Sequence, residues 1–294
     1  MRYRFIPHRK IWFTISLVLI LVGLVSLATR GLNFGIDFVG GTRMEMEFEE
    51  GATEGPVREI LARHGMGDAE IQLIGEDRQT VSIRSRHVPD AEMRQVLYED
   101  MEAALGPFSL ASLDEVLPVI GGELQRQGLL AIGLASVLMV LYITYRFEFK
   151  FGVVAIATAL HDVTLALGMF SLLWLEIDTA FIAAILTIVG YSINDTIVIF
   201  DRIRENLKYR KKETLTEIVD MGINQTLSRS INTSATTLLA VAALLIFGSA
   251  TIRDFSLALI IGILAGTYSS IFVASPLWVT WQEWSQQRLA RAKS

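Results

Sequence analysis

Long apolar runs dominate the hydrophobic pattern of this chain, with one run near the start and five in the second half. The runs are Ile11–Thr29, Leu129–Tyr145, Gly152–Leu175, Thr179–Phe200, Ile231–Ser249 and Phe255–Trp281. As a helix that rises about 1.5 Å per residue, each run is long enough to cross the roughly 30 Å hydrocarbon core of a bilayer. The pattern predicts a polytopic α-helical membrane protein with six transmembrane helices.

The first run resembles a secretory signal because basic residues precede it. Its apolar stretch is longer than the roughly 7–15 residues of a signal peptide's apolar region, and no small-residue cleavage site follows at Arg30–Asn33. We therefore expect residues 11–29 to remain as the first membrane span.

Residues 30–128 lie between the first two runs and show a different pattern, with short alternating and helical stretches. Period-two alternation predicts strands, and helical spacing bounded by glycine or proline predicts helices. The strands are expected at Thr42–Phe48, Ala69–Ile74, Thr80–Arg84 and Phe108–Val116, and the helices at Glu54–His64 and Asp90–Leu105. This βαββαβ order predicts an α+β ferredoxin-like domain between spans 1 and 2.

The composition supports a membrane protein and excludes several kinds of site. Hydrophobic residues make up 52% of the 294 residues and charged residues only 19%, against about 25% charged in soluble domains. There is no cysteine, which excludes disulfides and thiolate metal sites. The net charge of −5 gives no basic field, so we expect no nucleic acid partner, and the apolar runs predict contact with membrane lipids.

Basic residues are distributed unevenly between the two sides of the predicted membrane region. If the N-terminus is cytoplasmic, the segments on that side hold 15 Lys and Arg, whereas the short loops on the other side hold only Arg253. The positive-inside rule therefore places both termini in the cytoplasm. The predicted parts are a cytoplasmic N-terminus (1–10), span 1 (11–29), an extracytoplasmic domain (30–128), spans 2–6 (129–281) with a cytoplasmic loop (201–228), and a cytoplasmic tail (282–294).

The cytoplasmic loop contains one further predicted element. Leu215–Gly222 has the pattern of a short amphipathic helix that lies on the membrane surface.

Known enzymatic motifs are missing from the sequence. It contains no phosphate-binding loop, nucleophile elbow, zinc-protease motif or dinucleotide fingerprint, and only four histidines. We expect no catalytic residue, no bound metal and no cofactor. Any work that the protein performs must draw on a partner or on an ion gradient.

Ionisable residues inside the apolar runs are the strongest functional signal, because such residues are costly in a bilayer. Asp195 lies seven residues before Arg202, so it sits roughly 10 Å inside the membrane boundary at helical rise. Arg229 lies at the cytoplasmic entry of the fifth span, two residues before its apolar run, and this span runs antiparallel to the fourth. We predict that Asp195 and Arg229 meet as a switchable pair in a proton relay. The alternatives are a static ion pair and an arginine that anchors at the interface.

Other polar residues in the spans are candidates for a relay or for polar support. His161 and Asp162 fall near the middle of the third run, and Asn194, Asn232 and Thr233 lie around the fourth and fifth runs. Hydrogen bonds between helices are the competing interpretation for all five.

A glycine-rich motif follows the first run, Gly35-Ile-Asp-Phe-Val-Gly-Gly41. Its residues Gly35, Asp37, Gly40 and Gly41 suit a tight backbone path from the membrane to the following domain. Asp37 has the competing interpretation of a turn former or cap.

Taken together, four motifs resemble the SecF family, the smaller membrane subunits of the bacterial SecDF protein-export complex within the resistance-nodulation-division (RND) superfamily. They are the glycine motif, His161-Asp162, Tyr191–Asn206 and Asn224–Ser234, in this order along the chain. The resemblance covers almost the whole chain and implies six spans with one outer domain. It places the family's intramembrane aspartate on Asp195 and its arginine on Arg229.

The resemblance also implies partners and a role. A SecF-type subunit pairs with SecD, associates with the SecYEG translocon and a small auxiliary subunit, and contacts the translocating preprotein at the inner membrane. It uses the proton motive force, with protons as the coupling ion. The remaining alternatives are an RND-type exporter half for small molecules, a passive translocon scaffold and an intramembrane aspartyl protease. We expect the outer domain to move on the segments Arg30–Gly41 and Leu117–Gly128.

Overall fold

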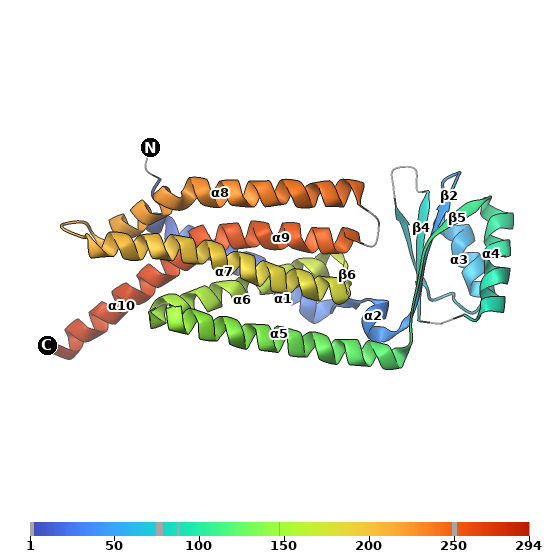
Figure 1. Cartoon of the computed structure of the whole chain (residues 1–294), viewed down its shortest axis with the longest axis horizontal. Helices are drawn as coiled ribbons and strands as arrows, with labels where there is room; N and C mark the ends of the chain where they lie inside the picture. Colours follow the sequence, from blue (N-terminus) through green and yellow to red (C-terminus); the bar gives the residue numbers. More distant parts are fainter. Residues whose placement is uncertain (1–2, 75–78, 87–88, 147, 249–251, 294) are drawn as a thin grey trace. The chain divides into compact units, whose positions relative to one another are not determined.

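The computed structural model describes residues 3–74, 79–86, 89–146, 148–248 and 252–293. The chain divides into two compact units, each described by itself below (Figure 1). The first unit joins Met1–Asn33 with Ala131–Ser294, and the second is Phe34–Leu130.

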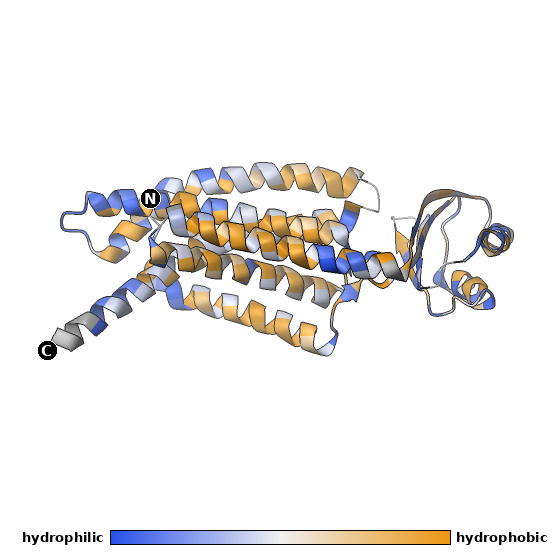
Figure 2. Ribbon diagram, turned by 60° about the horizontal axis from the view of Figure 1, so that its bottom comes forward, coloured by the Kyte–Doolittle hydropathy of each residue, from blue (hydrophilic) through white to orange (hydrophobic). Residues whose placement is uncertain are grey.

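Helices make up the first unit, and the six predicted spans are confirmed as six helices long and apolar enough to cross a membrane. After the short turn η1 (Ile6–His8), the helices are α1 (Arg9–Thr29), α5 (Pro118–Arg146), α6 (Phe149–Leu173), α7 (Thr179–Lys208), α8 (Leu215–Phe247), α9 (Arg253–Ser269), the π-helical turn η3 (Ser270–Ala274) and α10 (Ser275–Lys293). Hydrophobic residues run along these helices in Figure 2. Helices α6, α7 and α9 carry most of the buried side chains, whereas α1, α5 and α8 expose most of theirs.

Two helix boundaries differ from the sequence expectation. The segment Leu215–Gly222 is the first part of α8 and forms no separate surface helix. A capping box at Thr214 and Glu217 starts the helix, and no proline interrupts it before Phe247. Helix α5 begins at Pro118, so most of the expected hinge Leu117–Gly128 is helical.

Glycines set the closest helix contacts in the first unit. A Cβ placed on Gly23 of α1 would lie 2.9 Å from the Cα of Gly168 on α6. A Cβ on Gly262 of α9 would lie 2.2 Å from the Ile188 side chain on α7. Small residues at such points let helix backbones approach closely in a membrane.

The N-terminal segment is held to α8 by two side chains. The Asn224 amide accepts from the Tyr3 N–H (2.9 Å) and donates to the Tyr3 carbonyl (2.8 Å). The Asp220 carboxylate accepts from the N–H groups of Phe5 (2.9 Å) and Ile6 (3.0 Å). The start of α1 is therefore tied to the start of α8.

We expect Asn224→Ala to loosen this attachment. Loss of two hydrogen bonds worth about 1 kcal/mol each should speed hydrogen exchange at the Tyr3 amide roughly tenfold or more. The Ile6 amide, which Asp220 holds, should change less. Asn206→Ala is the matched control, because the Asn206 amide bonds to Gln225 on α8 and not to the N-terminal segment. Equal exchange at Tyr3 in both variants would contradict the attachment.

The second unit has the predicted βαββαβ order. Its elements are α2 (Ile36–Val39), β2 (Gly41–Phe48), α3 (Glu54–Arg63), β3 (Glu70–Ile74), β4 (Thr80–Ser85), α4 (Ala91–Leu105) and β5 (Phe108–Val116); two short strands, β1 (Asn33–Phe34) and β6 (Glu176–Ile177), complete the chain. The sheet order is β3-β4-β2-β5 with antiparallel neighbours, and both α3 and α4 lie on one face of the sheet (Figure 1). The core between them includes Met44, Met46, Ile60, Val81 and Leu97.

Candidate functional site

The Asp195 carboxylate is the central group of the candidate site. It lies on α7, is 8% exposed, and accepts a hydrogen bond from the Ser230 hydroxyl on α8 at 2.6 Å. Its second oxygen, Oδ2, is buried and has no hydrogen-bond partner among the described residues. A buried carboxylate oxygen without a partner is the atom at which a proton can bind.

Arg229 precedes Ser230 on α8, but its side chain is exposed. The described part of the chain shows no ion pair within 4.0 Å between Arg229 and Asp195, whose oxygens bond only to Ser230 or to no partner. The structure therefore brings Ser230, which the sequence analysis did not single out, onto Asp195. The direct Asp195–Arg229 pair that the sequence analysis predicted is not formed in this structure, because Ser230 takes the position against the carboxylate.

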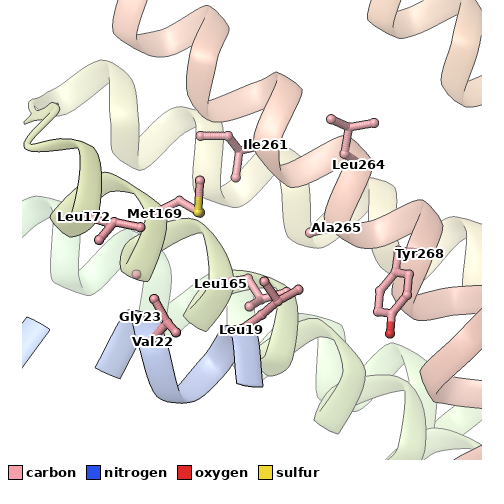
Figure 3. Close-up of a pocket in the computed structure, with 11 residues that line it drawn as sticks. Leu19, Val22, Gly23, Leu165, Met169, Leu172, Ile261, Leu264, Ala265 and Tyr268 are labelled. Carbon is pink, nitrogen blue, oxygen red and sulfur yellow. The ribbon is translucent and has the colours of Figure 1, made fainter. Parts of the chain in front are cut away.

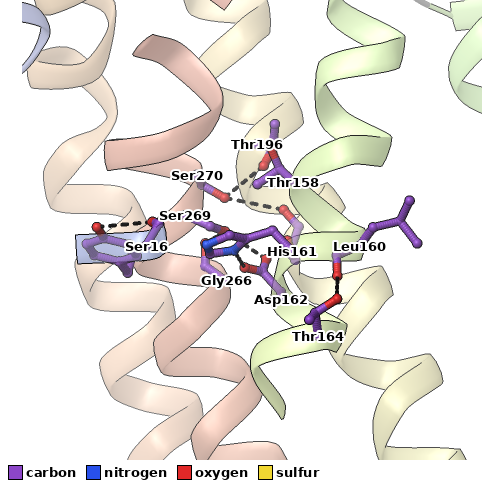
Figure 4. Close-up of polar contacts among 12 residues, drawn as sticks. Ser16, Thr158, Leu160, His161, Asp162, Thr164, Thr196, Gly266, Ser269 and Ser270 are labelled. Carbon is purple, nitrogen blue, oxygen red and sulfur yellow. Dashed lines mark hydrogen bonds and ion pairs between the residues drawn. The ribbon is translucent and has the colours of Figure 1, made fainter. Parts of the chain in front are cut away.

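Asp162 on α6 is the second buried carboxylate of the spans and is fully buried. It accepts from the hydroxyl groups of Ser192 on α7 (2.5 Å) and Ser269 on α9 (2.7 Å), and its other oxygen pairs with His161 Nδ1 at 2.8 Å. Figure 4 shows this cluster around His161 and Asp162. The carboxylate thus joins the three central helices, and the opposite ring nitrogen of His161 is buried with no partner in the described structure.

Hydroxyl groups continue from this cluster along α7. Thr196 bonds Ser270 on η3 at 2.8 Å, and Ser270 also donates to the Ser192 carbonyl at 3.4 Å. Ser192 and Thr196 flank Asp195 in sequence, so the helix that carries Asp195 is bonded to η3 on both sides of it. A π-helical turn such as η3 is often found at functional sites. The sequence signal that could have revealed these residues was the presence of Ser and Thr inside otherwise apolar spans.

Polar groups also face outward from the spans. Asn194 on α7 is exposed, and so are Arg229, Asn232, Thr233 and Thr236 on α8. The last four, which we call the α8 polar face, are spaced by three and four residues and so share one side of the helix. Of these, Thr233 donates only to the carbonyl of Arg229 in its own helix. The structure therefore does not place Asn232 or Thr233 against Asp195.

The glycine motif belongs to the second unit. Gly35 precedes α2, while Gly40 (φ 77°) and Gly41 (φ 136°) follow it with positive φ. Asp37 lies in the first turn of α2. The two successive positive φ values turn the backbone sharply between α2 and β2.

The end of α2 is covered by residues that the sequence analysis missed. The Phe38 carbonyl accepts from the Gln125 amide of α5 at 3.0 Å. A Cβ on Gly121 of α5 would lie 2.9 Å from that carbonyl oxygen. The second unit therefore includes the first turns of α5 as packing partners of the motif.

Two family models match the chain. The model of the C-terminal part of the protein export membrane proteins SecD and SecF matches residues 98–284, which contain Asp162, Asp195 and Arg229. The model of the SecD/SecF GG motif matches residues 25–52, which contain Gly40 and Gly41.

Similar proteins cover nearly the whole length of the chain. The protein translocase subunit SecF of Desulfurispirillum indicum is 42% identical over 96% of this chain and 93% of its own length. The protein translocase subunit SecDF of Bacillus subtilis is 39% identical over 96% of this chain but only 38% of its own length. The crystal structure of SecDF from Thermus matches with a TM-score of 0.88 at 38% identity, over 96% of this chain and 39% of that one. The chain therefore belongs to the SecD/SecF family of protein export membrane proteins.

Proposed function

We propose that the chain is the SecF-type subunit of a protein translocase accessory complex that uses the proton motive force to promote export of preproteins through SecYEG. The relatives named as SecF over nearly their full length support the export role. The observation that carries the proton coupling is the Asp195 carboxylate, buried in a membrane span with one oxygen bound by Ser230 and the other unpartnered.

Two opposing influences act on Asp195. Burial of a carboxyl group in general favours its neutral acid, whereas a positive charge brought close to it, such as that of Arg229 on the neighbouring helix, favours the carboxylate. A movement of α8 that changes the distance to Arg229 therefore changes the affinity of Asp195 for a proton. Conversely, proton binding at Asp195 removes a negative charge and so changes the attraction between α7 and α8. Proton binding can therefore drive a movement of these helices.

The available energy is sufficient for such a change. A proton that crosses a potential of about 150 mV releases roughly 3–4 kcal/mol, at about 2.3 kcal/mol per 100 mV. This energy shifts a two-state equilibrium by more than about a hundredfold. The second unit, with its net negative charge, is the part that we expect to move on the far side of the membrane.

A SecD-type partner accounts for the α8 polar face. Arginine and asparagine side chains exposed to lipid tails are costly, so a polar surface inside the bilayer indicates contact with another protein. The SecDF relatives contain a longer chain than this one, which supports a second subunit that supplies the remaining part. We assign the α8 polar face to contact with SecD. SecYEG, the preprotein and a small auxiliary subunit are the further partners that we propose. Both termini lie in the cytoplasm of this inner-membrane complex.

Asp195→Asn tests the proposal, because asparagine keeps the size of aspartate but carries no titrating charge. In a strain whose only copy carries Asp195→Asn, we expect preprotein export to fall to the level of the deletion strain, while membrane amount and SecD co-purification stay normal. Asp68→Asn, the same change at an exposed site of the second unit, is the matched control and should export normally. Normal export by Asp195→Asn would favour a passive scaffold instead.

A further inference from the structure

A recess with a volume of about 340 Å³ lies among α1, α6 and α9, apart from the polar site described above. Figure 3 shows its lining, which includes Leu19 of α1, Leu165 and Met169 of α6, and Ala265 of α9. The volume is at the lower end of the roughly 300–1,000 Å³ typical of ligand pockets. The recess is therefore large enough for a chain-like apolar group.

Small residues create the recess. Helices α1 and α6 touch at Gly23 and Gly168, so neither helix has a side chain at the crossing to fill the adjacent space. On α9 the facing residue is Ala265. Tyr268 turns its ring to the recess, while its hydroxyl donates to the Trp12 carbonyl at 3.0 Å and accepts from Ser16 at 3.3 Å. The surface offered to an occupant is consequently almost all carbon.

The positively charged side chain of Arg30 lies beside this apolar recess. Arg30 follows the last residue of α1, and its guanidinium donates to the carbonyl of Leu172, a lining residue, at 3.1 Å. The Arg30 side chain is exposed, and this one bond leaves most of its N–H groups available. Trp174, 43% exposed, lies two residues beyond Leu172, as aromatic residues do at the headgroup level of a membrane.

We propose that this recess binds one acyl chain of an anionic phospholipid whose phosphate contacts Arg30. The charge complements a phosphate, and the carbon lining complements an acyl chain. A helix of another protein, about 10–12 Å across with its side chains, is too wide for a space of this volume. The inference requires only that the six helices cross a bilayer, so it stands or falls independently of proton coupling at Asp195.

Native mass spectrometry of the purified full-length chain in detergent tests the site, with dioleoyl phosphatidylglycerol and dioleoyl phosphatidylcholine as probes. We expect one phosphatidylglycerol molecule to bind about fivefold more tightly than phosphatidylcholine, the effect of one basic residue beside an anionic headgroup. Arg30→Gln should remove this preference. Arg253→Gln, an exposed basic residue at the start of α9 that does not line the recess, should keep it.

A second pair of variants tests the acyl-chain part. Ala265→Phe fills the recess and should abolish the tight binding of both lipids, whereas Ala131→Phe, an exposed alanine on α5, should not. Unchanged binding by Ala265→Phe would overturn the site, and equal affinity for the two headgroups would overturn the role of Arg30. A photo-crosslinker at Leu165 that captures SecD instead of lipid in the native complex would also overturn the proposal.

Discussion

Gly41→Ala is expected to destabilise the second unit by about 3 kcal/mol. The residue has φ 136°, and a Cβ there would lie 2.2 Å from the carbonyl oxygen of Ser85, a backbone atom of the neighbouring strand β4. The unfavourable φ costs about 1–2 kcal/mol, and the overpacking adds about 1–3 kcal/mol. Hydrogen exchange of the full-length protein should show that Gly41→Ala speeds exchange of the β2 and β4 amides relative to the unsubstituted protein. The α7 amides should exchange at an unchanged rate.

Two other glycines in the same unit separate the two causes. Gly106 has φ 93° with nothing within 4 Å of an added Cβ, so Gly106→Ala should carry only the backbone cost of about 1–2 kcal/mol. Gly55 has neither a positive φ nor a close neighbour. Because alanine is a better helix former, Gly55→Ala should be neutral or stabilising by up to about 1 kcal/mol. If Gly41→Ala behaves like Gly106→Ala, the close contact with Ser85 is not a constraint.

The spans and the ferredoxin-like order were predictable because each follows from local periodicity. A run of apolar residues long enough for a bilayer has few other structures available, and alternation marks the strands of the second unit. Helix ends outside the bilayer were not predictable in the same way. The first turns of α5, which include Glu123 and Gln127, are polar and leave no apolar run, so the helix start at Pro118 was missed.

The sequence predicted that Asp195 is buried in a span, but it did not predict which residue contacts the carboxylate. The burial of Asp195 in a span followed from its distance to Arg202. Which residue of α8 meets it depends on the rotation of that helix, and consecutive residues differ by about 100° around a helix axis. Ser230 therefore faces Asp195 while Arg229 next to it points outward. Such rotations are set by packing between distant segments, which periodicity does not reveal.

Asp162→Ala is expected to reduce the free energy of unfolding of the first unit by about 3 kcal/mol. Hydrogen bonds between membrane helices average about 0.6 kcal/mol, and a buried donor left without its acceptor adds a desolvation cost of about 1–3 kcal/mol. Asp162 accepts three such bonds, from Ser192, Ser269 and His161. The substitution leaves Ser192 and His161 buried without this acceptor, while the Ser269 hydroxyl keeps a bond to the Gly266 carbonyl at 3.2 Å. Equilibrium unfolding in mixed detergent micelles measures the loss, and Thr164→Ala on the same helix, which removes only a bond to its own carbonyl at Leu160, should cost less than about 0.5 kcal/mol.

A double-mutant cycle decides whether Asp162 acts through α7. If the Ser192 hydroxyl is stabilised mainly by this carboxylate, Ser192→Ala should cost about 1 kcal/mol in the native protein and much less once Asp162 is alanine. The coupling should be about 1 kcal/mol, within the range of roughly 0.5–3 kcal/mol for residues in direct contact. Additive effects would show that α7 is held by its other contacts. In that case Asp162 would not act through Ser192 on the helix that carries Asp195, and the two buried carboxyl groups would be separate features of the membrane region.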